Sequence, residues 1–257
     1  MTDYSLHNKI ALVTGASRSI GIGAGIAREL ARAGADVFIT TFHGYDAEQP
    51  WGSRAAETDA LLAELRGHGV RAGALDIDQS DPTAPPRIFD AVEAALGPPD
   101  ILVNNAAYST RDGIDQLTAD ILDRHYAVNV RGMALLCAEF ARRWGREAGG
   151  RIINISSGQG VGPMPGELAY VASKGAVEAF TVTLSAELAG RGITVNAIDP
   201  GVTDTGWLTP DMHAEWTARA PFGRVGLPQD AARLVRFLAS DEGGWITGQV
   251  IHSRGGL

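Results

Sequence analysis

The chain has 257 residues, of which 45% are hydrophobic, and a formal net charge of −8. This length suits one large α/β domain or two small ones, and the composition is that of a globular protein with a sizeable core. The negative charge argues against general binding to nucleic acids or to acidic membranes. No apolar run reaches the roughly 18 residues of a membrane span and no signal segment is visible, so we expect a cytoplasmic protein without a membrane partner.

Short apolar runs alternate with longer amphipathic patterns along the chain. The predicted strands are Ile10–Thr14, Asp36–Thr41, Val70–Asp76, Ile101–Asn104, Ile152–Ser156, Thr194–Asp199 and Gln249–His252. Their continuous apolar character is typical of parallel strands that are buried on both faces. We therefore predict an α/β fold, a Rossmann-type doubly wound parallel sheet of about seven strands with helices on both faces. We expect it to form a single domain over residues 1–257.

Two long connections interrupt this alternation. Residues 43–54, HGYDAEQPWGSR, are rich in turn residues and precede a predicted helix near Ala55–Gly67. Residues 205–224 carry Trp207, Met212, Trp216 and Phe222 among polar residues. Apolar side chains in a long connection indicate a flap over a substrate pocket, and the alternative is a small helical subunit contact.

A glycine-rich turn follows the first strand. The stretch TGASRSIGIGAGIAREL places Gly15, Gly21 and Gly23 where the strand turns into a helix. Glycine allows the backbone to approach a pyrophosphate, and the helix N-terminus supplies donors and a positive dipole. A glycine cluster between a first strand and a helix therefore predicts a dinucleotide site.

The turn resembles that of the short-chain dehydrogenase/reductase family, which reads Thr-Gly-x-x-x-Gly-x-Gly. Thr14 and Gly15 match this pattern, but Ser19 stands in place of the middle glycine, and two additional residues precede Ile26. The elongated loop is similar to that of the enoyl-reductase branch, and it leaves open which backbone donors meet the phosphates. The resemblance implies cofactor contacts from Gly15, Ser17, Arg18, Ser19, Ile20 and Gly21.

The end of the second strand indicates which dinucleotide binds. A carboxylate there favours the ribose 2′-hydroxyl of NAD, but after Thr41 the first acid is Asp46. Arg18 in the glycine loop can grip a 2′-phosphate through its forked donors. The sequence therefore favours NADP over NAD. The alternative for Arg18 is a solvated surface charge.

The resemblance continues along the chain. The pair Asp76-Ile77 is similar to the one that borders the adenine, and Asn104–Ala107 is similar to the family's Asn-Asn-Ala-Gly turn. Pro200-Gly201 with the threonines downstream is similar to the turn that meets the nicotinamide carboxamide. The further cofactor contacts implied are Thr41, Asp76, Ile77, Asn105, Ala106, Ala107, Pro200, Gly201, Thr203 and Thr205, besides Tyr170 and Lys174.

Tyr170 and Lys174 stand four residues apart on a predicted helix, and Ser157 lies thirteen residues before the tyrosine. Positions i and i+4 share a helix face, so the lysine is expected to lower the pKa of the phenol. By resemblance, Ser157 polarises the substrate oxygen, Tyr170 exchanges the proton with it, and Lys174 holds the nicotinamide ribose. Asn129, through its backbone carbonyl and a water, links Lys174 to a proton relay. Ser156 is the local competitor of Ser157, as a strand-end hydroxyl.

The spacing of the tyrosine distinguishes two reactions within this family. The enoyl-reductase branch has its tyrosine seven residues before the lysine, where this chain has Glu167. The sequence therefore favours carbonyl or secondary-alcohol chemistry, most like that of a 3-oxoacyl-thioester reductase, with an acyl carrier protein as a candidate partner. The alternatives are a dehydrogenase that tailors alcohols, sugars or secondary metabolites, an enoyl reductase, and a nucleotide-binding regulator without turnover. The resemblance also implies a homotetramer or homodimer.

Other site chemistries find little support in the sequence. Cys137 is the only cysteine and lies among apolar residues, which predicts a small core residue and excludes a disulfide within the chain. The six histidines form no H-x-x-x-H pair, so no metal site is predicted.

Overall fold

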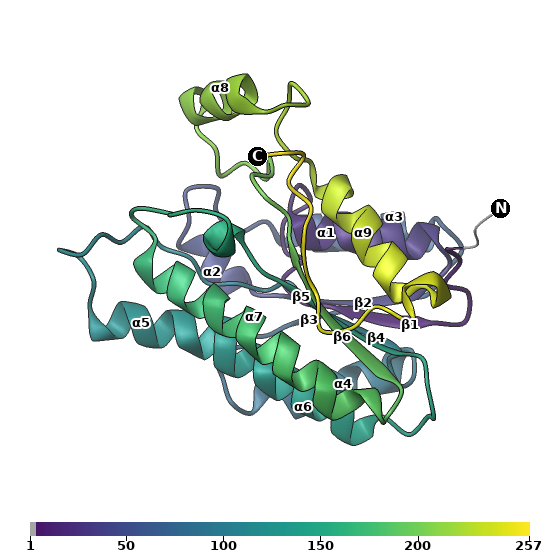
Figure 1. Cartoon of the computed structure of the whole chain (residues 1–257). Helices are drawn as coiled ribbons and strands as arrows, with labels where there is room; N and C mark the ends of the chain where they lie inside the picture. The colour runs from purple at the N-terminus through teal and green to yellow at the C-terminus, as the bar shows by residue number, and fades with distance from the viewer. Residues whose placement is uncertain (1–3) are drawn as a thin grey trace.

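The computed structural model describes residues 4–257, which form a seven-stranded parallel sheet in the order β3-β2-β1-β4-β5-β6-β7 (Figure 1). The strands are β1 (Ile10–Val13), β2 (Asp36–Thr41), β3 (Ala72–Asp76), β4 (Ile101–Asn104), β5 (Gly150–Ile155), β6 (Ile193–Asp199) and β7 (Val250–His252). The predicted fold class is confirmed. The strand order reverses direction between β1 and β4, and such a reversal opens a crevice at the carboxyl ends of the strands.

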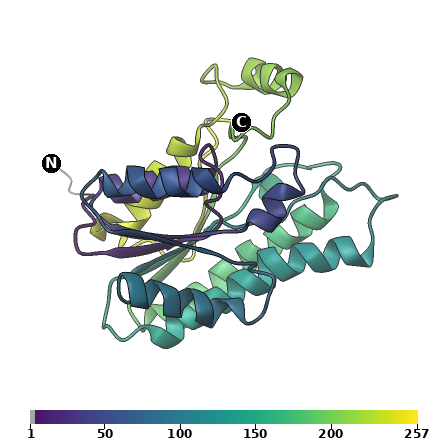
Figure 2. The ribbon, with the colours of Figure 1, turned by 180° about the vertical axis from the view of Figure 1, so that it is seen from behind.

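Helices cover both faces of the sheet, as the two opposite views show (Figures 1 and 2). The α-helices are α1 (Ile22–Arg32), α2 (His43–Ala47), α3 (Ala55–Arg66), α4 (Ala84–Ala95), α5 (Ala119–His125), α6 (Met133–Arg143), α7 (Leu168–Ala189), α8 (Pro210–Arg219) and α9 (Pro228–Ala239). A π-helical segment, η1 (Tyr126–Gly132), joins α5 to α6, and 3₁₀ turns cover Gly158–Gly160 (η2) and Asp241–Gly243 (η3). Within residues 4–257, no helix has the length and apolarity needed to cross a bilayer.

Alternation along each strand divides the apolar core into two layers. Val13 and Val103 pack with α1, α3 and α9, whereas Leu12 and Leu102 pack with α4, α6 and α7. Successive side chains of a strand point to opposite faces, so a strand that is apolar at every position must be covered twice. This is why the strands could be predicted as continuous apolar runs. Cys137 is fully buried in the second layer, as predicted.

The structure differs from the prediction mainly in the two long connections. Residues 43–54 contain the one-turn helix α2, and the predicted flap contains α8, whose N-cap Thr209 accepts a hydrogen bond from the amide of Met212. No residue of α8 is buried, and Figure 1 shows the helix standing clear of the sheet. A helix without a buried face shows no helical repeat of hydrophobic residues in its sequence. The capping residue Thr209 and the proline after it were the features that could have predicted α8.

Helices α1 and α9 approach each other closely at one glycine. A Cβ atom placed on Gly25 would lie 2.7 Å from the Cβ of Pro228, the first residue of α9. Such a contact is too short for van der Waals packing, so a larger residue must push the helices apart.

We expect the substitution Gly25→Ala to lower the free energy of unfolding by about 1–3 kcal/mol, because overpacking strains a well-filled interface. Gly190→Ala is the matched control, because Gly190 has ordinary helical torsions at the end of α7 and a Cβ there would meet no atom within 4 Å. The control should be neutral or stabilising by up to about 1 kcal/mol. Urea unfolding of wild type, Gly25→Ala and Gly190→Ala measures the three free energies of unfolding. Equal values for wild type and Gly25→Ala would contradict the close approach of α1 and α9.

Candidate active site

The predicted site residues meet at the carboxyl ends of β1, β4, β5 and β6. The Oγ1 atom of Thr14, after β1, accepts hydrogen bonds of 3.0 Å from the amides of Asn105 and Ala106, after β4. The side-chain amide of Asn105 donates in return to the carbonyl oxygens of Thr14 and Gly15, each at 2.9 Å. Gly15 has a φ of +71°, and a Cβ there would lie 2.5 Å from the Cα of Ala106. Only glycine allows the two turns to lie this close.

The elongated glycine loop uses several of its polar groups for internal contacts. The Oγ of Ser17 accepts from the amide of Phe42 at 3.1 Å, and the amide of Ser19 donates to Oε2 of Glu57 at 2.8 Å. The hydrogen bonds from Ser19 hold the pKa of Glu57 below its ordinary value. Sequence reasoning did not foresee Glu57, because it lies on α3, beyond the loop motif. Gly21 caps α1, whose first turn offers its backbone amides at the same end of the sheet.

Arg18 reaches out of this loop toward the predicted flap. Its Nη2 atom donates to the carbonyl oxygen of Thr205 at 2.7 Å, and its guanidinium lies 4.0 Å from the ring centroid of Trp51. Asp76, the last residue of β3, accepts hydrogen bonds from the Thr41 hydroxyl and the His43 amide, each at 2.9 Å. The Asp76 carboxylate thus also orders the turn that follows β2. Ile77 is buried beside it, and its amide donates to the Thr41 carbonyl at 2.9 Å.

The structure brings together the four predicted catalytic residues from three elements. Ser157 follows β5, Tyr170 and Lys174 lie on α7, and Asn129 lies in η1. The Ser157 side chain lies beside the Tyr170 phenol, where it acts to lower the pKa of that group. The Nζ atom of Lys174 lies 5.6 Å from the Tyr170 ring centroid and donates to the carbonyl oxygen of Ile155 at 2.7 Å. One phenol, one hydroxyl and one ammonium thus share a single site.

Burial dominates the electrostatics of this group. It raises the pKa of Tyr170 to about 12, although Ser157 acts in the opposite direction. It also lowers the pKa of Lys174 to about 8. The prediction that Lys174 lowers the pKa of the phenol is therefore wrong for the protein alone. Withdrawal from water penalises the phenolate, and the nearby Glu167, Tyr45 and Asp199 raise the pKa further, whereas Ser157 acts against this rise.

Asn129 has a structural role that its sequence position did not reveal. Its Oδ1 accepts from the amide of Tyr108 at 2.7 Å, while its Nδ2 donates to the carbonyl of Tyr108 and to Oγ of Ser173, both at 2.9 Å. Ser173 in turn donates to the carbonyl oxygen of Tyr170 at 2.7 Å. The buried amide thereby joins the turn after β4 to the turn of α7 that contains Tyr170.

The two serines after β5 are clearly different in their contacts. Ser156 is buried, donates to Oε1 of Glu178 at 2.7 Å and accepts from Nε2 of Gln159 at 3.1 Å. Ser157 instead contacts Tyr170. This arrangement favours Ser157 over Ser156 as the catalytic hydroxyl.

His125 is a residue at the site that sequence reasoning missed. Its fully buried ring lies 4.9 Å from the ring of Tyr108 and 6.4 Å from that of Tyr170, centroid to centroid. Its Nδ1 lies 2.7 Å from the Ile121 carbonyl oxygen and therefore donates, while Nε2 accepts from the Thr110 amide at 3.3 Å. The sequence offered no signal, because a single histidine on a helix is most often a core residue.

The predicted nicotinamide turn lies at the end of β6. Asp199 is fully buried, accepts from the amide of Gly201 at 2.9 Å, and is 3.0 Å from Nη1 of Arg254. Thr203 donates to the carbonyl oxygens of Pro200 and Gly201, both at 3.2 Å. The Arg254 guanidinium also lies against Gly158, which follows Ser157. The segment that contains Arg254 thus returns to the site. The sequence did not predict this contact, because Arg254 and Gly158 are far apart along the chain.

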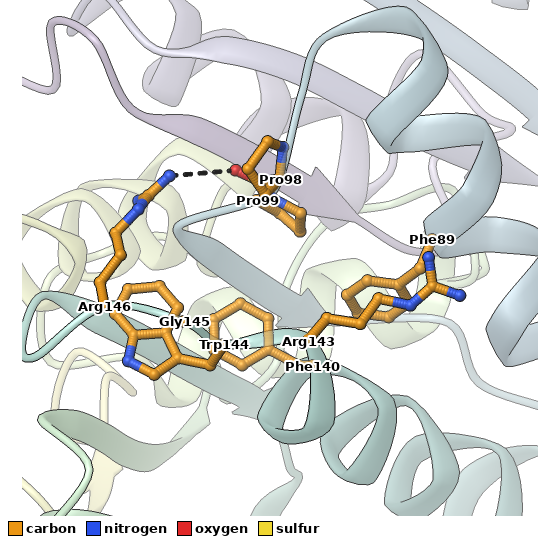
Figure 3. A pocket seen from close by; sticks show the side chains of 8 residues that line it. All are labelled: Phe89, Pro98, Pro99, Phe140, Arg143, Trp144, Gly145 and Arg146. Atoms are coloured by element: carbon orange, nitrogen blue, oxygen red, sulfur yellow. Dashed lines mark hydrogen bonds between the residues drawn. The ribbon is translucent and has the colours of Figure 1, made fainter.

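A hollow lies at the opposite end of the sheet (Figure 3). Pro98 and Pro99 precede β4, and Trp144 follows α6, so this hollow is at the amino ends of the strands. Its two arginines are already paired, Arg143 with carboxylates of α4 and α6, and Arg146 with Asp100. The hollow contains none of the predicted site residues.

Comparisons with known proteins agree with this geometry. A family model described as enoyl-(acyl carrier protein) reductase matches residues 15–257. The uncharacterized oxidoreductase YjdA of Bacillus subtilis is 50% identical over 97% of this chain and 96% of its own. The 3-oxoacyl-[acyl-carrier-protein] reductase FabG of Staphylococcus aureus is 35% identical over 97% of this chain and 98% of its own.

A solved structure shares the whole fold. The short chain dehydrogenase of Burkholderia cenocepacia, crystallised in complex with NADP, superposes with a TM-score of 0.87 at 38% identity and covers 98% of both chains. The sequence matches, the shared fold and the assembled Ser157, Tyr170 and Lys174 lead to one conclusion. The chain belongs to the short-chain dehydrogenase/reductase family of oxidoreductases.

Proposed function

We propose that the protein transfers a hydride between NADP(H) and a carbonyl or secondary alcohol. The observation that carries this proposal is the meeting of the Ser157 hydroxyl, the Tyr170 phenol and the Lys174 ammonium, whose Nζ lies 5.6 Å from the centroid of the phenol ring. In the direction of reduction, Ser157 polarises the substrate carbonyl and Tyr170 donates its proton to the oxygen. A positive Lys174 stabilises the negative charge that the phenol acquires and holds the nicotinamide ribose. The nicotinamide supplies the hydride.

The residues at the carboxyl ends of the strands fit a dinucleotide. Gly15 approaches the β4 turn in a backbone conformation that suits glycine, and the adjacent α1 N-terminus favours a pyrophosphate. Arg18 suits a 2′-phosphate because its guanidinium presents a fork of donors. The crystallised relative from Burkholderia cenocepacia, in complex with NADP, supports the same cofactor for this chain.

Two reactions of the family compete for this site. The matching family model is described as an enoyl reductase, and the elongated glycine loop is also similar to that of the enoyl-reductase branch. The Tyr170 phenol nevertheless stands four residues before Lys174 and lies beside Ser157. Glu167 occupies the position seven residues before Lys174, where the enoyl-reductase branch has its tyrosine. Glu167 cannot replace a phenol, so we favour carbonyl chemistry.

The substrate class follows from relatives rather than from the pocket. The likeness to a 3-oxoacyl-[acyl-carrier-protein] reductase supports a 3-oxoacyl thioester, with an acyl carrier protein as partner. A tailoring dehydrogenase for alcohols, sugars or secondary metabolites would use the same catalytic residues and is the second candidate. Residues 205–224 would cover the substrate, and a homodimer or homotetramer in the cytoplasm remains our prediction.

We expect the substitution Tyr170→Phe to reduce carbonyl reduction at least a hundredfold, because the general acid is lost. NADPH binding should stay within about threefold of wild type. The measurement is NADPH oxidation with a panel of 3-oxoacyl thioesters, small ketones and enoyl thioesters. Tyr4→Phe is the control, because Tyr4 packs on Phe237 outside the site. Unchanged turnover in Tyr170→Phe would rule out the assigned acid, and tight NADPH binding without any turnover would favour the regulator.

The pKa values predict how reduction depends on pH. Lys174 is charged only below its pKa of about 8, whereas Tyr170 keeps its proton up to about 12. We therefore expect kcat/KM for reduction to be level at neutral pH and to fall as pH rises through about 8. In Lys174→Arg the remaining activity should lose this decline, because a guanidinium stays charged. A wild-type profile that stays level well above the pKa of Lys174 would contradict the assigned role of this residue.

We expect NADPH to be preferred over NADH, with the preference carried by Arg18. The substitution Arg18→Gln should lower kcat/KM for NADPH about tenfold to a hundredfold, because it removes a charge-assisted contact with phosphate. It should change kcat/KM for NADH less than about threefold. Steady-state kinetics with both cofactors test this, and equal losses with the two would show that Arg18 does not read the phosphate.

A further inference from the structure

Two tryptophans from the irregular connections meet beside the glycine loop. Trp51 belongs to residues 43–54, and Trp207 belongs to the flap at 205–224. Their ring centroids are 4.8 Å apart at an interplanar angle of 68°, the edge-to-face arrangement that aromatic rings prefer. Large aromatic side chains bury considerable area, so this contact binds the two connections together.

Arg18 completes the cluster from the glycine loop. Its guanidinium covers the Trp51 ring at 4.0 Å, and its Nη2 donates to the Thr205 carbonyl at 2.7 Å. A guanidinium stacked on an indole is attracted by the ring face, and its N–H groups point outward in the plane of the stack. The N–H groups other than the one that donates to Thr205 can therefore bind an anion. We call Arg18, Trp51 and Trp207 the indole clamp.

Trp51 is itself held in place, and the start of the flap packs against the glycine loop. The Nε1 of Trp51 donates to Oδ1 of Asp46, a carboxylate that is 5% exposed, at 3.0 Å. Gly206 precedes Trp207 with a φ of +78°, and a Cβ there would lie 2.9 Å from Nη2 of Arg18 and from Cδ1 of Ile20. Glycine thus lets the start of the flap lie directly on the glycine loop.

Residues 43–54 also contact the far side of the site. The Tyr45 hydroxyl donates to the Ser109 carbonyl at 3.4 Å, and its ring lies 5.7 Å from that of Tyr108, centroid to centroid. Tyr108 is the residue whose backbone Asn129 holds. The segment therefore reaches from the indole clamp to the turn after β4.

We propose that Trp51 and Trp207 are positioning residues that hold the Arg18 guanidinium ready for the 2′-phosphate of the cofactor and tie its position to that of the flap. The proposal rests on the proposed function, in which NADP(H) is the cofactor. A long arginine side chain loses much rotamer freedom when it binds an anion. The indole clamp removes that freedom beforehand, so more of the phosphate interaction remains as affinity. Trp51 and Trp207 should therefore matter only for ligands that carry the 2′-phosphate and only while Arg18 is present.

The experiment compares ligands with and without that phosphate. Dissociation constants of adenosine 2′,5′-bisphosphate, NADPH and NADH are measured by calorimetry for wild type, Trp51→Leu, Trp207→Leu, Arg18→Gln and both double variants with Arg18→Gln. Trp245→Leu is the matched control, because this tryptophan is 98% exposed. Trp51→Phe keeps a ring under the guanidinium but loses the hydrogen bond to Asp46, so it serves if the leucine variants unfold.

We expect each leucine variant to weaken binding of NADPH and the bisphosphate about fivefold to tenfold, and binding of NADH less than about twofold. In the Arg18→Gln background, the same substitutions should have no further effect. The Trp51→Phe variant should show a smaller loss than Trp51→Leu. Equal losses for NADPH and NADH, or losses that add to that of Arg18→Gln, would overturn the proposal.

The outcomes also separate this proposal from the proposed function. Bisphosphate binding needs no turnover, so a dependence on Trp51 through Arg18 would support the indole clamp even if no carbonyl were reduced. Conversely, NADPH-dependent carbonyl reduction with unaltered NADPH affinity in both leucine variants would overturn the indole clamp and leave the proposed function standing.

Discussion

The arrangement of the site depends on how β1 and β4 meet at the point where the strand order reverses. Thr14 accepts the amides of Asn105 and Ala106, and Asn105 returns two hydrogen bonds to the backbone of Thr14 and Gly15. From this point the chain adds strands first on one side of β1 and then on the other. The connections that follow β1 and β4 therefore run to opposite sides, which leaves a crevice at the carboxyl ends of these two strands. The hydrogen bonds fix the width of that crevice, because these polar groups are satisfied only when the two turns touch. The additional residues of the glycine loop lie after Gly15, so they leave these contacts between the two turns unchanged.

A second hydrogen-bond network extends from this junction to Tyr170. The turn after β4 continues to Tyr108, whose backbone binds the Asn129 side chain, and Asn129 binds Ser173 one turn of helix from Tyr170. His125 packs its ring between Tyr108 and Tyr170 from the same side. The phenol is thus held from its own helix and from the neighbouring turn. Preorganisation of this kind lowers the cost of aligning the acid with the substrate oxygen.

Burial is the largest cause of the shifted pKa values of Tyr170 and Lys174. Tyr170 keeps its proton at neutral pH, whereas the Lys174 ammonium is close to losing its own. A neutral phenol is the form required to donate a proton in reduction, and its anion becomes accessible only with positive charge nearby. Lys174 and the positive nicotinamide ring of the oxidised cofactor are the two sources of such charge in the proposed function. The i, i+4 spacing of Tyr170 and Lys174 predicts a lowered pKa for the phenol, but the raising effect of burial on this pKa is larger.

The sequence by itself determined the fold class, the order of the strands along the chain, the glycine turn and the spacing of Ser157, Tyr170 and Lys174. These features are local, because hydrophobic period, turn chemistry and helical spacing are encoded within a few residues. Tertiary structure alone decided the partners of the irregular segments: Trp51 with Arg18 and Trp207, Glu57 with Ser19, His125 with two tyrosines, and Arg254 beside Gly158. It also reversed the expected shift in the Tyr170 pKa, since burial depends on everything that packs around a group. Contacts between segments far apart in the chain leave no period or spacing in the sequence, so only the folded chain reveals them.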